Sequence, residues 1–229
     1  MLDLFSCMFV PEQVFHPADG KTLLPAAPQK RALPPAFFLA GDSTTGSGGG
    51  WGDAVVSSLT GGSTRENLGD SGATTGSFRN EGFWGEVLAA VESHKHEYTP
   101  YVTIQFGHNN QKTEAGLAAV VDSLSDGMLR QHLENVRELT IQAAETGALW
   151  ANLNEASREY VIAIGESNSH TYNLSDGDNM HINKEGGIIF AGIVALLLKG
   201  LNAEFDEFII VTPELVAALE GGEYYFPEL

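Results

Sequence analysis

The chain has 229 residues, of which 43% are hydrophobic and 18% are charged, and this composition is sufficient for one large domain with a filled core. The formal net charge of -18, from 12 Lys and Arg against 30 Asp and Glu, argues against nucleic acid and anionic membranes as partners, because both are bound through clustered cations. The single cysteine, Cys7, excludes an internal disulfide, and no Cys/His grouping has the spacing of a zinc site, so we expect no metal.

The first part of the chain is rich in proline and carries little hydrophobic periodicity. We therefore expect an irregular N-terminal arm over residues 1–35, followed by one domain over 36–229. The opening run MLDLFSCMFV is apolar, but it lacks a cationic segment, is interrupted by Asp3 and is too short to span a bilayer. It predicts neither a signal peptide nor a membrane anchor.

From residue 36 onward, apolar strands alternate with helices. AFFLA is a short apolar run bounded by Pro and Gly, as expected of a strand buried on both faces. YVTIQF is β-branched and bounded by Pro100 and Gly107, which predicts another strand. The expected elements of this half are strands over 36–40, 65–68 and 101–106, and helices over 53–59 and 78–94.

The second half continues the alternation. A long amphipathic pattern is followed by a short strand, a helix capped by Asn154, a polar loop and an apolar helix. This order predicts an α/β domain with a parallel sheet covered on both faces, and ligands bind such sheets at the carboxyl ends of the strands. The expected elements are a helix over 126–146, a strand over 148–153, a helix over 154–165 and a helix over 188–198.

The tripeptide Gly-Asp-Ser occurs twice, ending at Ser43 in FFLAGDSTTG and at Ser71 in ENLGDSGATTG. Ser43 follows the more apolar run, which is typical of a central strand, whereas Ser71 follows the polar RENL. We therefore predict that Ser43 is the reactive serine and that Ser71 shapes its loop. Neither serine fits the G-x-S-x-G turn of α/β-hydrolases, because Thr45 and Ala73 stand at its last position.

Polar residues that suit acyl transfer follow the predicted strands or precede the last helix. The reaction needs a nucleophilic hydroxyl, an imidazole, a carboxylate to orient the imidazole and hydrogen-bond donors for the oxyanion. An Asp three residues before a His can reach the Nδ1 side of the ring across a tight turn. We predict Ser43, His181 and Asp178 as the catalytic residues, and the N–H of Ser43, the N–H of Gly72 and the amide of Asn109 as oxyanion donors.

The blocks GDSTT, NLGDSGATT, YVTIQFGHNN and DGDNMHIN resemble, in this order, the four signature blocks of the SGNH/GDSL hydrolases, in particular the rhamnogalacturonan acetylesterase-like branch. The resemblance covers about residues 36–112 and 139–198. It implies a flavodoxin-like three-layer α/β/α fold with a parallel sheet, and it assigns the same roles to Ser43, Gly72, Asn109, Asp178 and His181.

The resemblance also implies a function: a serine esterase that removes O-acetyl groups from carbohydrate, with pectic rhamnogalacturonan as the family's substrate. Such an enzyme needs no cofactor, and we expect a monomer. Relatives are mostly extracellular, although this N-terminus offers no clear signal peptide. An acidic polymer fits poorly with a chain of net charge -18, so acetylxylan, another acetylated sugar or a small lipid ester stay open as substrates.

Two departures from the family pattern motivate other hypotheses. Asn110 stands where the third block usually has Asp, and the stretch 112–139 has room for one crossover rather than two. Either LAAVV at 117–121 forms a substitute strand, or the sheet is short of one interior strand and helix. A catalytically impaired, carbohydrate-binding or vestigial protein is one alternative, and a lipolytic GDSL esterase is another.

Several residues near these motifs have competing interpretations. Asp176 competes with Asp178 as the orienting acid, although its spacing from His181 fits less well. His108, beside the predicted oxyanion residue, could contact substrate or make a structural hydrogen bond. The tryptophans Trp51 and Trp84 are expected in the core or at its rim rather than as sugar platforms.

Overall fold

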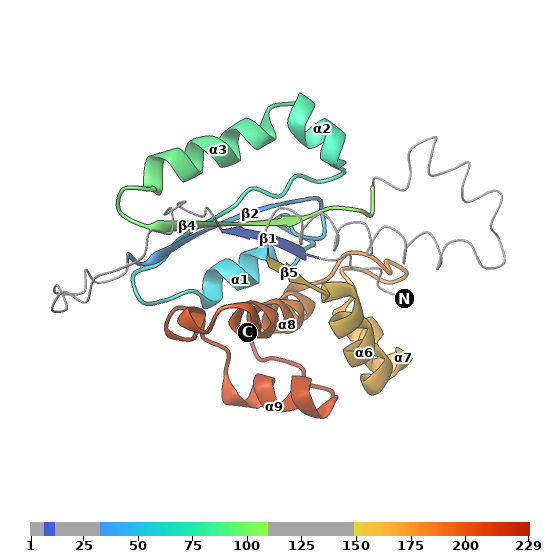
Figure 1. Cartoon of the computed structure of the whole chain (residues 1–229). Coiled ribbons are helices and arrows are strands. Elements are labelled where there is room, and N and C mark those ends of the chain that lie inside the picture. Colours follow the sequence, from blue (N-terminus) through green and yellow to red (C-terminus); the bar gives the residue numbers. More distant parts are fainter. Residues whose placement is uncertain (1–6, 12–32, 110–148) are drawn as a thin grey trace, which may run out of the picture.

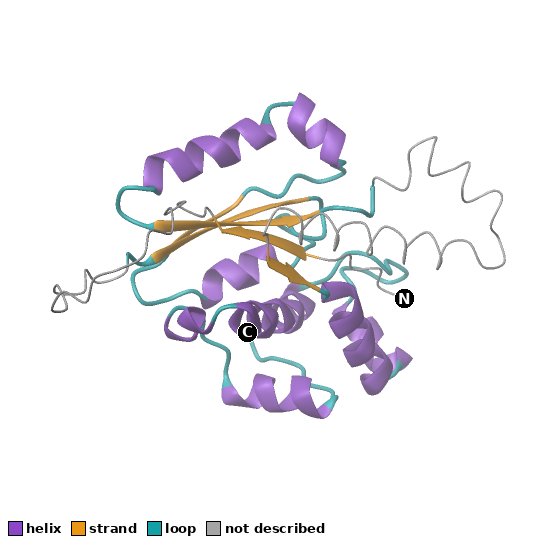
Figure 2. Ribbon diagram, in the orientation of Figure 1, coloured by secondary structure: helices purple, strands orange, loops and turns teal. Residues whose placement is uncertain are grey.

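The computed structural model describes residues 7–11, 33–109 and 149–229. A five-stranded sheet, in the order β3-β2-β4-β1-β5, lies between layers of helices (Figures 1 and 2). Three of its strands, β3, β2 and β4, are parallel, so the fold is α/β and compatible with a flavodoxin-like arrangement. The strands are β1 (Cys7–Pro11), β2 (Pro35–Gly41), β3 (Thr64–Asn67), β4 (Thr99–Gln105) and β5 (Leu149–Ala151).

Helices cover both faces of the sheet. On one face lie α2 (Thr75–Asn80) and α3 (Phe83–His94), at the top of Figure 1. On the other face α1 (Gly52–Ser58) packs beside the long helix α8 (Lys184–Leu201). Two further helices, α6 (Leu153–Ile164) and α9 (Pro213–Gly221), pack against α8. The short helices are α7 (Glu166–Ser169), η2 (His170–Tyr172) and η3 (Ala203–Glu207).

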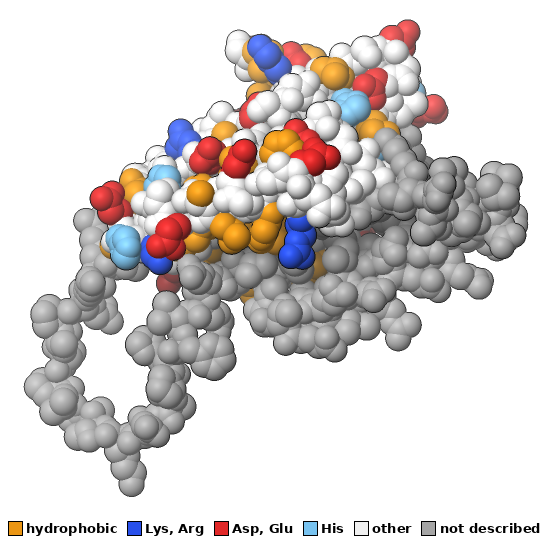
Figure 3. Space-filling view, turned by 90° about the horizontal axis from the view of Figure 1, so that it is seen from above, with side chains coloured by type: hydrophobic (Ala, Val, Ile, Leu, Met, Phe, Trp, Pro, Cys, Tyr) orange, Lys and Arg blue, Asp and Glu red, His pale blue; other side chains and the backbone are white. Residues whose placement is uncertain are grey.

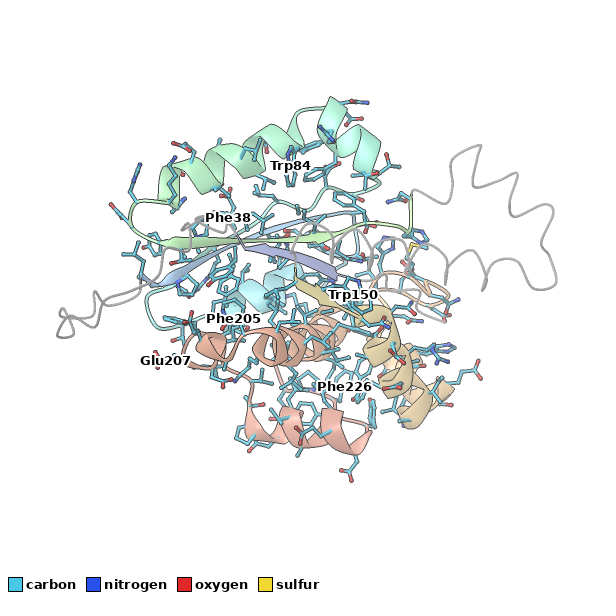
Figure 4. All side chains as sticks on the ribbon, in the orientation of Figure 1. Phe38, Trp84, Trp150, Phe205, Glu207 and Phe226 are labelled. Carbon is cyan, nitrogen blue, oxygen red and sulfur yellow. The ribbon has the colours of Figure 1, made fainter. Side chains whose placement is uncertain are left out.

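Strand β2 divides the core in two because its side chains alternate between the layers. Phe37 packs against Tyr101 and Phe205 on the α8 side, with ring centroids 5.7 and 5.2 Å away. Phe38 points the other way and lies 5.5 Å from the ring of His94 on α3. Figure 4 shows Phe38 and Trp84 on one side of the sheet and Phe205 on the other. Burial on both faces, predicted for 36–40, is confirmed, since Ala36–Ala40 are at most 1% exposed.

Strand β1 is the main difference from the sequence-based expectation. Residues 1–35 were expected to be irregular, yet Cys7–Pro11 lies between β4 and β5 and runs antiparallel to both, so the sheet is not entirely parallel. Two consecutive parallel strands need a crossover connection, usually a helix, but an antiparallel strand does not. A segment that is distant in the sequence can therefore occupy this position. The substitute strand considered at 117–121 and the helix expected over 126–146 lie outside the described residues.

Most of the remaining elements match the predicted positions, with shifted ends. The single helix expected over 78–94 is two helices, separated at Gly82, whose φ of 98° few other residues adopt. Helix α6 begins one position earlier than expected, because Asn152 rather than Asn154 caps it by accepting the N–H of Glu155. Helix α9 was not predicted.

The surface over α2 and α3 shows how the negative charge is distributed. Acidic side chains lie scattered among uncharged and hydrophobic ones on this face (Figure 3). An ion pair joins Lys95 to Glu92 at 2.7 Å, but both side chains are exposed, so it contributes little to stability. None of the helices in the described ranges combines the length and the apolar character that crossing a membrane requires.

Candidate active site

The first Gly-Asp-Ser lies in a tight turn at the carboxyl end of β2. The carbonyl of Asp42 accepts the N–H groups of Thr45 and Gly46, at 3.0 and 2.8 Å, which closes the turn around Ser43. The Asp42 side chain is fully buried, and its Oδ1 accepts the N–H and the hydroxyl of Thr44 at 3.0 and 2.8 Å. The aspartate therefore stabilises the turn from inside, while Ser43 is only partly buried.

Ser43, His181 and Asp178 form one chain of hydrogen-bonding distances. Ser43 Oγ lies 3.1 Å from His181 Nε2, and His181 Nδ1 lies 3.0 Å from Asp178 Oδ2. The side chains of His181 and Asp178 are 31% and 24% exposed, so the serine is held at the surface rather than in the core. The structure thus brings together the three residues predicted to be catalytic, in the order that proton transfer requires.

The turn from Asp178 to His181 also keeps the carboxylate charged. Asp178 Oδ1 accepts the backbone N–H groups of His181 and Met180 at 3.0 and 2.9 Å. The bond from the His181 N–H is the largest cause that holds the pKa of Asp178 below its ordinary value, against the opposing effect of burial. A charged Asp178 is an acceptor for an N–H at Nδ1, and the tautomer with that proton leaves Nε2 as an acceptor toward Ser43 Oγ. The competing residue, Asp176, is exposed.

A run of glycines brings the histidine loop against the serine loop. The N–H of Ile182 donates to the carbonyl of Gly49 at 3.0 Å, and a Cβ on Gly49 would lie 3.2 Å from the His181 ring. The histidine loop is closed at its base, because the N–H of Leu174 donates to the His181 carbonyl at 2.9 Å. Gly49 and Gly50 therefore serve close packing, since a Cβ on Gly50 would overlap the carbonyl oxygen of Thr44, while Gly48 has a φ of 85°; the sequence signal was the unbroken Gly48–Gly50.

The predicted oxyanion donors lie on neighbouring loops at the same edge of the sheet. Gly72 follows β3 with a φ of 82°, and Asn109 follows β4. The amide Nδ2 of Asn109 donates to the carbonyl of Ala73, next to Gly72, at 3.2 Å. Because β2 lies between β3 and β4, the turn of Ser43 lies between these two loops. Ser71, in the loop of Gly72, is exposed.

The other residues singled out from the sequence have structural positions. Trp51 is fully buried and Trp84 partly so, which confirms that both belong to the core or its rim. His108 is 6% exposed, while Asn110 lies outside the described residues.

The sequence-based reasoning missed Gln105, the last residue of β4. Its amide is buried and makes hydrogen bonds to the loop of Ser43. Its signal was a polar residue in an otherwise apolar strand, at the end where the site lies.

Two cavities lie near the histidine loop. The larger, about 690 Å³, is bordered by Gly48–Gly50 and Ile182 on one side and by apolar α8 residues, including Ile188 and Ala191, on the other. The smaller, about 450 Å³, is bordered by Arg158, His170 and Asn179 among others. Their volumes suit small molecules, although Ser43 borders neither.

No set of three or more His, Cys, Asp or Glu side chains with the geometry of a metal site occurs in the described ranges. In the comparisons with known proteins, no family model, no curated protein and no solved structure matches this chain.

Proposed function

We propose that this protein is a serine esterase of the SGNH type that hydrolyses carboxylic esters. The observation that carries the proposal is the continuous path from Ser43 Oγ to His181 Nε2, at 3.1 Å, and from His181 Nδ1 to Asp178, at 3.0 Å. The side chains that form this path come from loops far apart in the chain, and the path has the geometry of an activated nucleophile.

The chemistry assigned to these residues is acyl transfer in two halves. Ser43 Oγ attacks the ester carbonyl carbon while His181 Nε2 takes the serine proton, and His181 then returns this proton to the leaving alcohol. Water attacks the acyl-serine in the second half, His181 takes a proton from the water, and the acid leaves as Ser43 recovers its proton. Asp178 stays ionised throughout and stabilises the imidazolium.

The tetrahedral intermediate of each half-reaction carries a negative oxygen, and this oxygen needs hydrogen-bond donors that stabilise it. We assign this role to the N–H of Ser43, the N–H of Gly72 and the side-chain amide of Asn109. Their loops follow three adjacent parallel strands, so the donors are carried by the rigid part of the fold. Removing one such donor costs about 100- to 1000-fold in kcat in serine hydrolases.

For the substrate, we propose O-acetyl esters on carbohydrate. The four sequence blocks described above support this class, and a small acyl group is consistent with a serine held in a tight surface turn. Hydrolysis by water requires no cofactor, and the proposal includes no partner besides the substrate. Acetylated rhamnogalacturonan is one substrate of this class. The same four sequence blocks imply that the enzyme acts outside the cell.

A second candidate, a lipolytic esterase, is favoured by the larger cavity. Its wall includes the apolar residues Ala54, Ile188 and Leu215, and it is also bordered by Gly49, which packs on the His181 ring. A longer acyl chain would find apolar surface there. Rates with p-nitrophenyl acetate, butyrate and octanoate separate the two candidates, since the carbohydrate deacetylase is expected to prefer acetate.

The test is release of p-nitrophenol from p-nitrophenyl acetate by the purified chain, with folding verified by circular dichroism. Ser43→Ala is expected to abolish turnover, whereas the matched variant Ser71→Ala keeps it within about twofold. A folded wild-type chain that turns over none of the three esters contradicts the proposal. Saturable binding of acetylated polysaccharide by that inactive chain would instead support a carbohydrate-binding, vestigial protein.

A further inference from the structure

Gln105 lies where β4 meets the turn of the proposed nucleophile. It is the last residue of β4, it is paired with Gly41 at the end of β2, and it is 1% exposed. A Cβ on Gly41 would lie 2.7 Å from the main-chain oxygen of Gln105, so the two strand ends are in close contact. The side chain is therefore buried at the point where the chain turns toward Ser43.

The amide of Gln105 uses both its donor and its acceptor on this turn. Its Oε1 accepts the indole N–H of Trp51 at 3.2 Å and the hydroxyl of Thr45. Its Nε2 donates to Thr44 Oγ1 at 2.7 Å. The single hydroxyl proton of Thr44 then goes to Asp42 Oδ1, 2.8 Å away. One orientation of the amide satisfies all four of these bonds.

These bonds hold the residues on both sides of Ser43. Asp42 precedes the serine and receives the Thr44 proton, while Thr44 and Thr45 follow it and are bonded directly to Gln105. Ser43 itself bonds in the opposite direction, toward His181. Rotation of the turn would break several buried hydrogen bonds at once, and each unsatisfied buried group is costly.

We propose that Gln105 is a positioning residue for Ser43, whose amide holds the turn so that Ser43 Oγ stays within reach of His181 Nε2. The inference rests on the proposed esterase function and adds a residue to it that does not touch the substrate. Only a side chain of this length with both a donor and an acceptor fits the role. Glutamate keeps the shape but loses the donor, and it adds a charge beside the buried Asp42 carboxylate.

The main test is Gln105→Met, which keeps the length and burial of the side chain but makes none of its hydrogen bonds. We expect kcat for p-nitrophenyl acetate to fall about 10- to 100-fold with KM within about twofold, because a displaced nucleophile loses rate rather than affinity. The rate is measured well below the melting temperature of each variant. If Gln105→Met does not fold, Gln105→Leu, which likewise removes the hydrogen bonds and adds no buried charge, replaces it with the same expectation.

Thr103→Val is the matched control. Thr103 lies two residues earlier on β4, is equally buried, and its hydroxyl has no hydrogen-bond partner among the described residues. This variant is expected to keep both kcat and the melting temperature. It separates the loss of the Gln105 bonds from a general effect of changing a buried residue on β4.

A double-mutant cycle with Thr45→Val shows whether Gln105 acts through the turn. Gln105→Met is expected to lower kcat by a clearly smaller factor in the Thr45→Val background than in the wild type, because the hydrogen bond between Gln105 and Thr45 is already absent there. Unchanged kcat in a folded Gln105→Met chain, or fully additive losses in the cycle, overturns the inference and leaves the esterase proposal standing. Absence of turnover by the folded wild type overturns both.

Discussion

The two Gly-Asp-Ser turns have the same tripeptide and different surroundings. The first follows β2, which is paired on both sides, and its aspartate is fully buried. The second follows β3 at the edge of the sheet, and it is held through its own backbone groups: the N–H of Asp70 donates to the carbonyl of Gly41 at 3.0 Å, and the carbonyl of Ala73 accepts the amide of Asn109 at 3.2 Å. Ser43 faces His181, whereas Ser71 is exposed.

The two serines differ in what surrounds their common motif. Every side chain next to Ser43 makes buried hydrogen bonds, and these fix the direction of the turn. Among the described residues, the side chains of Asp70 and Ser71 make no comparable buried hydrogen bonds, and the second turn is held instead by the N–H of Gly69, which donates to Asn67 Oδ1 at 3.2 Å. Position in the sheet, rather than the tripeptide, therefore separates the surroundings of the two serines.

The largest expected effect concerns covalent labelling of the two serines. A fluorophosphonate is expected to modify Ser43 and not Ser71, because Ser43 Oγ lies 3.1 Å from His181 Nε2, whereas Ser71 is exposed and contacts no imidazole of the described residues. His181→Ala should slow the labelling about 1000-fold or more, while His170→Ala, an exposed histidine on η2, keeps the wild-type rate. Mass spectrometry of the digested protein locates the adduct, and an adduct on Ser71 would contradict the proposed difference between the two serines.

An intermediate effect concerns the two aspartates. Asp42→Ala removes an acceptor that binds two groups of Thr44 in the core, so we expect it to lower the free energy of unfolding by about 1–3 kcal/mol. Asp70→Ala is expected to change this free energy by less than about 0.5 kcal/mol. Urea denaturation followed by circular dichroism measures both, and equal losses would contradict the distinction between the turns.

The smallest expected effect is the pH dependence that Asp178 adds to stability. Its pKa is lowered in the folded chain from the ordinary value of 3.8, mainly by the N–H of His181, so the folded state favours the charged form. This stabilisation is complete above the unfolded value and is lost as the pH falls through the folded one.

The Asp178→Asn variant should therefore have a lower free energy of unfolding than the wild type at pH 7. The difference between the two chains should disappear as the pH is brought below about 4. Urea titrations of both chains at several pH values measure the difference. Ser71→Ala, in the turn without a carboxylate–imidazole pair, serves as the control and should differ from the wild type by the same amount at every pH. A deficit that persists at low pH would assign Asp178 a role independent of its charge.

Much of the site could be predicted because its signals are local. The apolar run before Ser43 predicts a buried strand, and the three-residue spacing of Asp178 and His181 permits the observed contact. Gln105 could not be found in this way, since its role depends on a turn that follows a different strand. The same holds for β1, because a segment of five residues without periodicity carries no information on which strands it will join.

Strand β1 has a consequence for the order of folding. Cys7 pairs with Ala151 and Met8 with Ile104, so this segment is synthesised well before the strands that it pairs with. Contacts so distant along the chain close slowly, and until then β4 and β5 have edges open to other chains. The sheet at the proposed esterase site is thus completed only when the two halves of the polypeptide have met.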